Sequence, residues 1–200
     1  MGEVKRQYRQ TRRAEQTAAT RRKIVEAAVE LHSTVGPAAT SLSAVANEAG
    51  VSRPTLYSHF PDESALFRAC TLHHIAQDPP PDPTAWREID NASERLRVAL
   101  RELYAHYARN QDMLDNVFRD MHIVESMREF NLPLVEQSFA QMTEILTVAY
   151  EDPPGSASRR AALVAVAISF DTWKTMTRTR GLDGQEALEL MARAVDAAVD

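Results

Sequence analysis

The side chains best suited to chemistry lie close together between residues 41 and 60, and their types favour hydrogen bonding over catalysis. The guanidinium group of Arg53 can donate two parallel hydrogen bonds to O6 and N7 of a guanine. Tyr57 and His59 can donate to phosphate oxygens, which positions a duplex without reading its sequence. These groups can act together only if one rigid element presents them.

Residues 41–60 predict two short helices joined by a tight turn. Gly50 stands where the first helix must end, because glycine adopts a positive φ without steric cost. Ser52 is suited to cap the second helix, and Pro54 is accepted in its first turn. Leu56 and Phe60 lie four residues apart and return an apolar stripe to the core. The pattern indicates a helix-turn-helix, whose second helix enters the DNA major groove.

Charge is distributed unevenly along the chain. Residues 1–60 hold nine Lys or Arg against five acids, or +4, and the remainder holds 14 basic and 23 acidic residues, or −9. A positive N-terminal part can bind phosphates while an acidic body stays away from DNA. The basic residues Arg12, Arg13, Arg21 and Arg22 precede the helix-turn-helix.

The composition excludes several classes of protein. The 200 residues are 44% hydrophobic and 26% charged, which is ordinary for a soluble globular protein. A single cysteine, Cys70, excludes an internal disulfide framework and a cysteine zinc cluster, and it fits a reducing compartment. We expect a cytoplasmic protein, because no apolar segment follows the N-terminal charges and the longest apolar run, residues 161–168, is too short for a membrane span.

Apolar residues recur with helical period throughout, which predicts an all-α fold of about nine helices. The main expected helices cover residues 17–35, 62–77, 88–109, 111–121, 131–150, 157–180 and 184–199. We expect three parts. Residues 1–16 form a basic flexible arm, residues 17–60 a helix-turn-helix DNA-binding domain, and residues 61–200 a helical effector-binding and dimerisation domain.

The run from Ser41 to Phe60 resembles the helix 2, turn and helix 3 of the tetracycline-repressor (TetR) family of transcriptional regulators. The resemblance is specific over about residues 17–67 and architectural beyond them. It implies an all-helical homodimer in which three N-terminal helices bind DNA and later helices enclose a ligand pocket. It also implies that the last two helices pair with those of the partner chain.

The resemblance implies phosphate contacts for Tyr57, His59 and Thr55, and base contacts for Arg53 and Pro54. The candidate DNA-binding residues lie on the two short helices, their caps and the basic arm, and are Ser41, Ser43, Ser52, Arg53, Pro54, Thr55, Tyr57, Ser58, His59, Arg12 and Arg13. One position departs from the family. Glu63 replaces the usual lysine that grips a phosphate at the start of helix 4, and a carboxylate repels phosphate.

Two further sets of candidates come from the C-terminal part. Aromatic, methionine and histidine side chains near apolar helix faces could line an effector pocket, and they are Trp86, Tyr104, Tyr107, Phe118, Met121 and His122. Broad, alanine-rich apolar faces near the C-terminus suit a four-helix dimer interface, with Leu163, Ala167, Phe170, Leu188, Met191 and Val195 as candidates.

We expect a homodimeric regulator, a repressor that binds an inverted-repeat operator in double-stranded DNA and is released by a largely apolar small molecule. Activation and co-repression also fit. An alternative is a TetR-like ligand-binding protein that no longer binds DNA, for which Glu63 is the main support. A di-metal enzyme needs paired Glu-x-x-His motifs, and Glu102 and His106 do not have that spacing. We therefore expect no enzyme activity, no metal and no cofactor.

Overall fold

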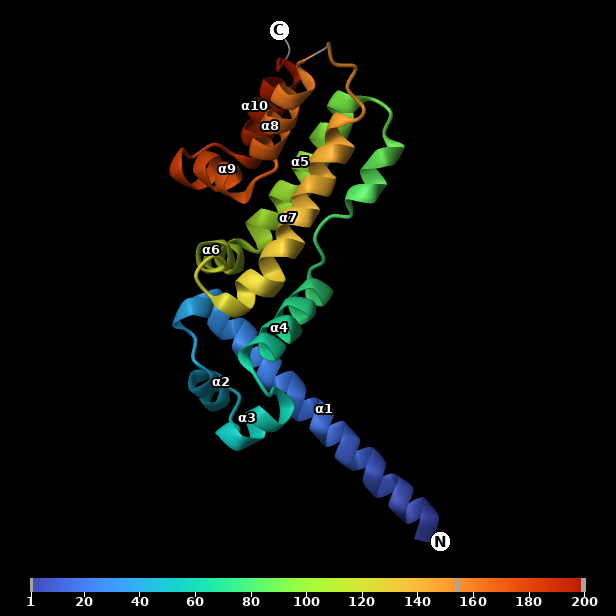
Figure 1. Ribbon diagram of the computed structural model, residues 1–200, viewed down its shortest axis with the longest axis vertical. Helices are drawn as coiled ribbons and strands as arrows, with labels where there is room; N and C mark the ends of the chain where they lie inside the picture. The colour runs from blue at the N-terminus through green and yellow to red at the C-terminus, as the bar shows by residue number, and fades with distance from the viewer. Residues whose placement is uncertain (1, 154, 199–200) are drawn as a thin grey trace. The chain divides into compact units, whose positions relative to one another are not determined.

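The computed structural model describes residues 2–153 and 155–198, with side chains from Arg6 onward. Over these residues the chain forms ten α-helices and three shorter helical segments, and it contains no strand (Figure 1). The expected all-α fold is confirmed. Apolar residues that recur with a period near 3.6 share one face of a helix, which is why the sequence predicted this fold. None of the described helices has the length and apolar character that crossing a membrane requires.

The helices divide into two compact units. The first contains residues 1–78 and 115–132, and the second contains residues 79–114 and 133–200. The chain leaves the first unit at the proline-rich segment after Asp78. These units are defined by packing; the functional boundary at residues 60 and 61 stays a prediction.

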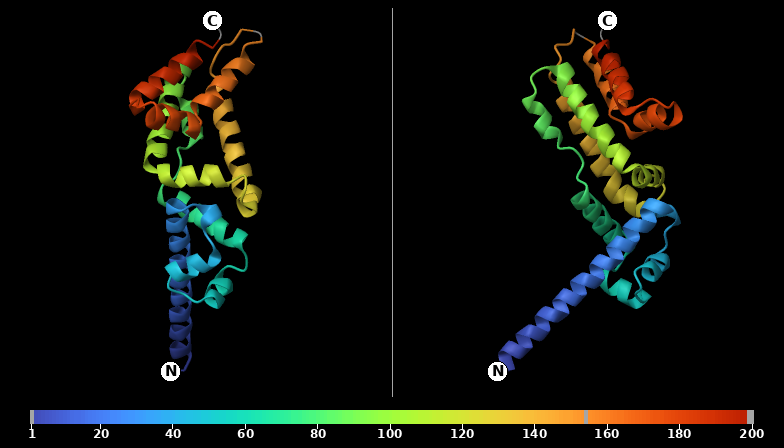
Figure 2. Two further views of the ribbon diagram at one scale, coloured as in Figure 1. Left: turned by 90° about the vertical axis from the view of Figure 1, so that its left-hand side faces the viewer. Right: turned by 180° about the vertical axis from the view of Figure 1, so that it is seen from behind.

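The first unit is built on a long helix. It contains α1 (Gly2–Thr34), η1 (Pro37–Ala39), α2 (Leu42–Glu48), α3 (Arg53–His59), α4 (Glu63–Gln77), most of α6 (Gln111–Asp120) and the start of α7 (Glu125–Thr147). Helices α2 and α4 both pack on α1, and α3 packs on α2. The N-terminal half of α1 extends beyond these helices (Figure 2).

The expected flexible arm is helical in the structure. Residues 2–16 continue α1 toward the N-terminus, where the expected helix began at residue 17. Arginine, glutamine and glutamate are frequent there, and each has a high helix propensity. Residues 6–18 are exposed, so the helix gains no stability from packing in this part of α1.

Helix α6 also packs within the first unit, at the C-terminal end of α1. Asn116 donates to the carbonyl oxygens of His32, at 3.0 Å, and Ser33, at 2.8 Å. The carboxylate of Asp120, which is 1% exposed, accepts a hydrogen bond from the backbone N–H of Ala38 at 2.9 Å. The last carbonyls of a helix have no intrahelical partner, so Asn116 supplies hydrogen-bond donors to the carbonyls at the end of α1.

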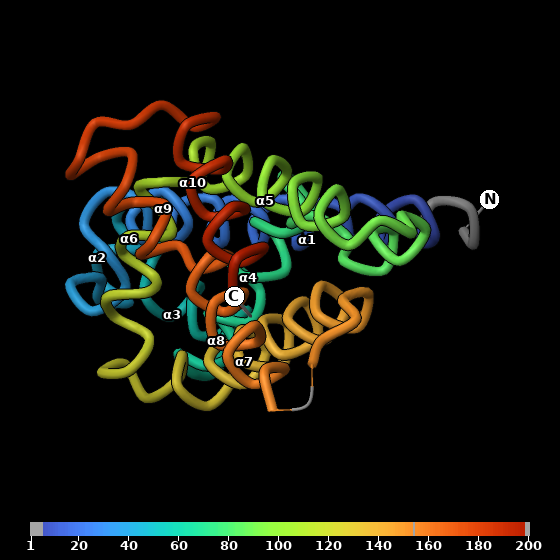
Figure 3. Tube along the Cα trace, turned by 90° about the horizontal axis from the view of Figure 1, so that it is seen from above, coloured from blue at the N-terminus to red at the C-terminus, as the bar shows by residue number. Residues whose placement is uncertain are grey.

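The second unit is a helical bundle around α5 (Ala92–Arg109). It also contains η2 (Pro83–Glu88), most of α7, α8 (Ala157–Ala167), α9 (Phe170–Lys174), η3 (Thr175–Thr179) and α10 (Gly184–Asp196). Helix α10 lies beside both α5 and α8 (Figure 3). The core is apolar, with residues such as Leu96, Leu100 and Leu188 almost completely buried.

The expected helix 157–180 is interrupted after Ile168. Ser169 caps a new helix, because its hydroxyl oxygen accepts the backbone N–H of Thr172 at 3.2 Å. The break leaves carbonyls at the end of α8 without helical partners. The hydroxyl of Tyr104 donates to Ala167 at 2.9 Å, and the hydroxyl of Tyr107 donates to Ile168 at 2.6 Å.

Helix α7 begins earlier than expected. It starts at Glu125, so Pro133 lies inside the helix and not in its first turn. A proline inside a helix removes one backbone hydrogen bond. Pro133 is also the first residue of the segment of α7 that belongs to the second unit.

Candidate nucleic-acid interface

Serine side chains cap both short helices of the predicted helix-turn-helix. The hydroxyl oxygen of Ser41 accepts the backbone N–H of Ala44 at 3.1 Å, and that of Ser52 accepts the N–H of Thr55 at 3.2 Å. Gly50, between the helices, has a φ of +64°, which strains any residue with a Cβ. Two helices, their caps and their turn therefore follow the expected pattern.

Helix α3 buries one face and exposes the other. Leu56 and Phe60 are at most 1% exposed and belong to the core formed with α1, α2 and α4. Arg53, Pro54 and Tyr57 are exposed, the last at 43%. The exposed face presents a guanidinium and a phenol to solvent, which are groups that can bind base edges and phosphates.

The remaining candidates on these helices are partly used within the protein. The hydroxyls of Ser52 and Thr55 lie 2.8 Å apart, and the hydroxyl of Ser58 donates to the carbonyl of Thr55 at 2.7 Å. Ser41 and Ser58 are exposed, whereas Ser43, Thr55 and His59 are half-buried. Each serine that caps a helix could still donate its hydroxyl hydrogen to a phosphate.

Arg21 fixes the C-terminal end of α3. Its guanidinium donates to the backbone carbonyl of His59 at 3.0 Å and lies over the Phe60 ring, 4.1 Å from the ring centre. The carbonyls at the end of a helix carry partial negative charge and lack helical partners, so a cation is favourable there. We expected Arg21 to be one of the basic residues available to phosphates. It instead positions α3, the second helix of the helix-turn-helix and here called the recognition helix.

The other basic residues of α1 differ in availability. Arg22 faces Glu26 one turn along the helix, with Nε and Oε1 3.9 Å apart. Arg12 and Arg13 are exposed, and the Arg12 guanidinium lies 6.0 Å from the centre of the Tyr8 ring. Arg12 and Arg13 therefore remain the candidates for phosphate contacts from the N-terminal half of α1.

The start of α4 carries two carboxylates. Asp62 caps the helix by accepting the backbone N–H of Ala65 at 2.7 Å, and Glu63 occupies the first turn. Both side chains are favourable at a helix N-terminus. Their negative charges also make this end of α4 a poor site for a phosphate, as expected from the presence of Glu63 in the sequence.

Comparison with known proteins identifies the domain that carries these helices. Residues 24–70 match the model of the family described as bacterial regulatory proteins, tetR family. Residues 24–70, which include α2, α3 and the turn between them, are therefore similar to the N-terminal domain of that family. The match indicates a DNA-binding transcriptional regulator.

Several known proteins resemble the chain over most of its length. It is 27% identical over 177 residues to the HTH-type transcriptional activator FasR of Mycolicibacterium smegmatis, covering 84% of this chain and 78% of FasR. A transcriptional regulator of the TerR/AcrR family from Aquifex aeolicus has a TM-score of 0.57 at 16% identity, covering 88% and 98% of the two chains. Thermus thermophilus FadR, in complex with lauroyl-CoA, has a TM-score of 0.55 at 23% identity, covering 90% and 95%.

The six expected effector residues are divided between the two units. Trp86, Tyr104 and Tyr107 belong to the second unit, whereas Phe118, Met121 and His122 belong to the first. Trp86 is 1% exposed and donates its indole N–H to Glu102 at 2.7 Å.

The hydroxyls of Tyr104 and Tyr107 donate to carbonyls at the C-terminal end of α8, so each could still accept a hydrogen bond from a ligand but could not donate one to it. Met121 is buried, Phe118 is half-buried and His122 is exposed. Sequence periodicity could not separate core aromatics from pocket aromatics, because both face inward.

The expected dimer residues are mostly part of the protomer's own core. Phe170, Leu188 and Val195 are at most 3% exposed, and Ala167 is fully buried. These four cannot form a partner-facing surface, since their side chains already pack against the same chain. Leu163 and Met191 are half-buried, while Val166 and Leu190 are 52% and 42% exposed.

Sequence analysis missed Asn116, Asp120 and the positioning role of Arg21. These residues act through contacts with backbone groups far away in the chain, for which the sequence contains no spacing signal. Over the described residues, no group of three or more His, Cys, Asp or Glu side chains is arranged to hold a metal ion.

Proposed function

We propose that this chain is a transcriptional repressor that binds an inverted-repeat operator as a homodimer and is released by a small molecule. The observation that carries the proposal is the exposed polar face of α3, with Arg53 at its start and Arg21 holding its end. Arg53 reads a guanine in each half-site, and Tyr57 holds the backbone. Repression requires only that the bound protein covers a promoter.

The homodimer follows from the size of the recognition helix. Helix α3 has seven residues, so it spans about 10 Å and reaches only a few base pairs. Two copies related by a two-fold axis place two such helices about 34 Å apart, one turn of DNA. Val166 on α8 and Leu190 on α10 are exposed apolar residues that support pairing through these helices.

Release by an effector is supported by the TetR family and by FadR, a structural neighbour in complex with lauroyl-CoA. A coupling free energy of 1–3 kcal/mol between ligand and operator binding changes occupancy about fivefold to 150-fold. FasR, described as an activator, favours activation as a second candidate function. A reporter placed behind the operator separates the two, because repression lowers its expression and activation raises it.

The DNA interface is tested by selecting fragments from random duplex DNA with the purified protein. We expect an enriched inverted repeat. Arg53→Ala should relax the preference at one base pair in each half-site, whereas Tyr57→Ala should weaken all sequences to a similar degree. Arg87→Ala is the matched control, because Arg87 is an exposed arginine of η2 in the second unit.

Selection without any enriched inverted repeat would overturn the proposal and favour the TetR-like ligand-binding protein that does not bind DNA. Because Glu63 is the main support for that alternative, a variant at this position tests it directly. Glu63→Lys adds a cation at the start of α4 and should increase affinity for all duplexes while leaving the preferred sequence unchanged. Sedimentation of the free protein tests the dimer separately from DNA binding.

A further inference from the structure

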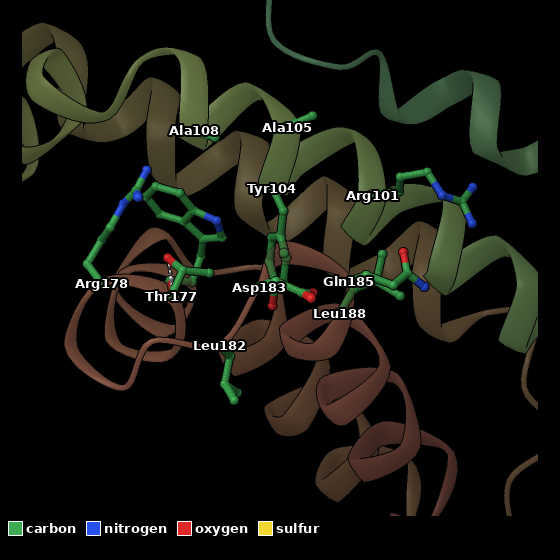
Figure 4. Close-up of a pocket in the computed structure, with 12 residues that line it drawn as sticks. Arg101, Tyr104, Ala105, Ala108, Thr177, Arg178, Leu182, Asp183, Gln185 and Leu188 are labelled. Carbon is green, nitrogen blue, oxygen red and sulfur yellow. Dashed lines mark hydrogen bonds between the residues drawn. The ribbon is translucent and has the colours of Figure 1, made fainter.

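Helix α5, the segment from α9 to η3, and the start of α10 line an open recess of about 390 Å³ (Figure 4). The recess lies entirely within the second unit. Its volume falls in the range of about 300–1,000 Å³ that is usual for small-molecule sites. Of the six expected effector residues, Tyr104 alone lines it.

The floor of the recess is apolar and almost completely buried. Trp173, Tyr104 and Leu188 are at most 4% exposed. The Trp173 ring lies 5.4 Å from that of Phe170, measured between ring centres, and the hydroxyl of Tyr104 is bound to a backbone carbonyl. Tyr104 and Trp173 are 4% and 2% exposed, so a ligand contacts only small parts of these two rings. Aromatic rings favour a flat aromatic body through offset or edge contacts.

Two arginines line the recess. The Arg178 guanidinium lies over the Trp173 ring, 5.3 Å from its centre, and Figure 4 shows Arg178 at one side of the recess. Arg101 lies on α5, at the other side of the same view. Neither Arg101 nor Arg178 forms an ion pair within the part of the chain that the structure describes. Both side chains are exposed and so are accessible to a ligand.

The one acid among the lining residues does not neutralise them. Asp183 caps α10, where its carboxylate accepts the backbone N–H of Glu186 at 2.8 Å. The partial positive charge of the helix N-terminus offsets part of the Asp183 charge. The lining residues thus combine an aromatic floor with two arginines against one capped aspartate.

We propose that this recess binds a small aromatic carboxylate, with its ring against the small exposed parts of Trp173 and Tyr104 and its carboxylate on Arg178. An arginine fork matches the two oxygens of a carboxylate and gives charge-assisted hydrogen bonds. A carboxylate bound there keeps the Arg178 guanidinium over the indole. The inference names a ligand class for the effector in the proposed function, but the binding step requires no DNA.

Trp173 reports on its own site. The chain contains two tryptophans, so Trp86→Phe leaves Trp173 as the single indole. Titration of this variant with naphthalene-2-carboxylate should change the fluorescence saturably, and the neutral naphthalene-2-carboxamide should bind at least about tenfold more weakly. Isothermal titration calorimetry with the unaltered protein checks that Trp86→Phe has not changed the site.

Variants of the arginine separate recognition from nonspecific adsorption. Arg178→Gln should weaken the carboxylate at least about tenfold by calorimetry and leave the carboxamide unchanged, since an arginine–carboxylate pair contributes through charge. Arg178→Lys should give an intermediate loss, because lysine keeps the charge without the fork. Arg87→Gln, outside the recess, should bind like the unaltered protein.

Three outcomes would overturn the inference: no saturable binding, equal affinity for the acid and the amide, or the same loss from Arg87→Gln as from Arg178→Gln. These measurements use protein without DNA, and the operator selection uses protein without ligand. Failure of the ligand site therefore leaves the operator result intact, and failure of operator selection leaves the ligand result intact.

Discussion

The guanidinium of Arg21 lies 4.1 Å from the centre of the Phe60 ring, and it donates to the carbonyl oxygen of the residue before it, His59. Arg21 is on α1, and Phe60 follows the last residue of α3. The contact joins the long helix of the first unit to the end of the recognition helix. The contribution of this contact to stability can be separated from the effect of removing a positive charge.

Arg21→Ala should lower the free energy of unfolding by about 1 kcal/mol, because it removes a cation–π contact and a charged donor to a helix end. It should also weaken operator binding, since the end of α3 is less firmly held. Urea unfolding followed by circular dichroism measures the first effect, and a DNA-binding titration measures the second.

The adjacent Arg22→Ala is the control for Arg21→Ala. It removes the same charge from the same helix but breaks only an exposed pair with Glu26. An exposed pair contributes about 0–1 kcal/mol. Equal stability of the two variants would show that the Arg21 contact with α3 contributes nothing.

Ser52 has two separable roles, as a helix cap and as a candidate DNA contact. Ser52→Ala should cost about 1 kcal/mol of stability, because the backbone N–H of Thr55 loses its acceptor. Ser52→Asp keeps a capping oxygen but adds a negative charge. It should retain stability and lose operator affinity if Ser52 lies near phosphate, and thermal unfolding with DNA titration measures both quantities.

Ser52→Thr keeps the capping hydroxyl and is the control that should resemble the unaltered protein in both measurements. Unchanged operator affinity of Ser52→Asp would place Ser52 away from DNA. The cap would then be its entire role.

Asn116 should be important for stability despite lying far from α1 in the sequence. Asn116→Ala leaves the carbonyls of His32 and Ser33 without their side-chain donor at the buried end of α1. We expect a loss of about 1–3 kcal/mol, the usual cost of an unsatisfied buried polar group. Urea unfolding followed by circular dichroism is the measurement.

Asn47→Ala is the control for Asn116→Ala, because Asn47 is exposed on α2. It should change the free energy of unfolding by less than about 0.5 kcal/mol. A similar small effect from Asn116→Ala would mean that water replaces the amide at the end of α1.

His32 should make the stability of the first unit depend on pH. Burial lowers the pKa of His32 to about 4 from 6.5, while the charge of Asp120 acts in the opposite direction. Below pH 6.5 His32 is protonated in the unfolded chain but stays neutral in the folded chain. The free energy of unfolding therefore falls as the pH falls toward 4. The expected loss is about 2 kcal/mol between pH 7 and pH 5.

His32→Phe keeps the stacked contact with Phe67, whose ring centre is 4.8 Å away, and removes the titration. Its free energy of unfolding should depend less on pH over this range than that of the unaltered protein. His122→Asn is the control at an exposed histidine and should keep the original dependence. Both tryptophans belong to the second unit, so circular dichroism and not tryptophan fluorescence must follow this transition.

Lowering the pH further should destabilise the fold through Asp120 as well. The hydrogen bond from Arg119 is the largest cause that lowers the pKa of this carboxyl, and the N–H of Ala38 acts in the same direction. Stability from Asp120 is present above the ordinary pKa of an aspartate and is lost as the carboxylate is protonated. The two groups therefore act in successive pH ranges, first His32 and then Asp120.

The helix-turn-helix could be predicted from the sequence in detail. Gly50, Ser52, Leu56 and Phe60 have the conformation, cap or burial that their spacing indicated. Each of these features depends on residues at most four apart, through backbone geometry or helical period. Such local features can therefore be predicted from the sequence alone.

The roles of Tyr104, Phe170 and Arg21 required the folded chain. Tyr104 binds the carbonyl of a residue 63 positions away, and Arg21 binds one 38 positions away. Phe170 lies on an apolar face that could have met a partner but packs within its own protomer. An inward-facing side chain has the same sequence pattern in a core, a pocket or an interface, and only the packing of distant helices distinguishes them.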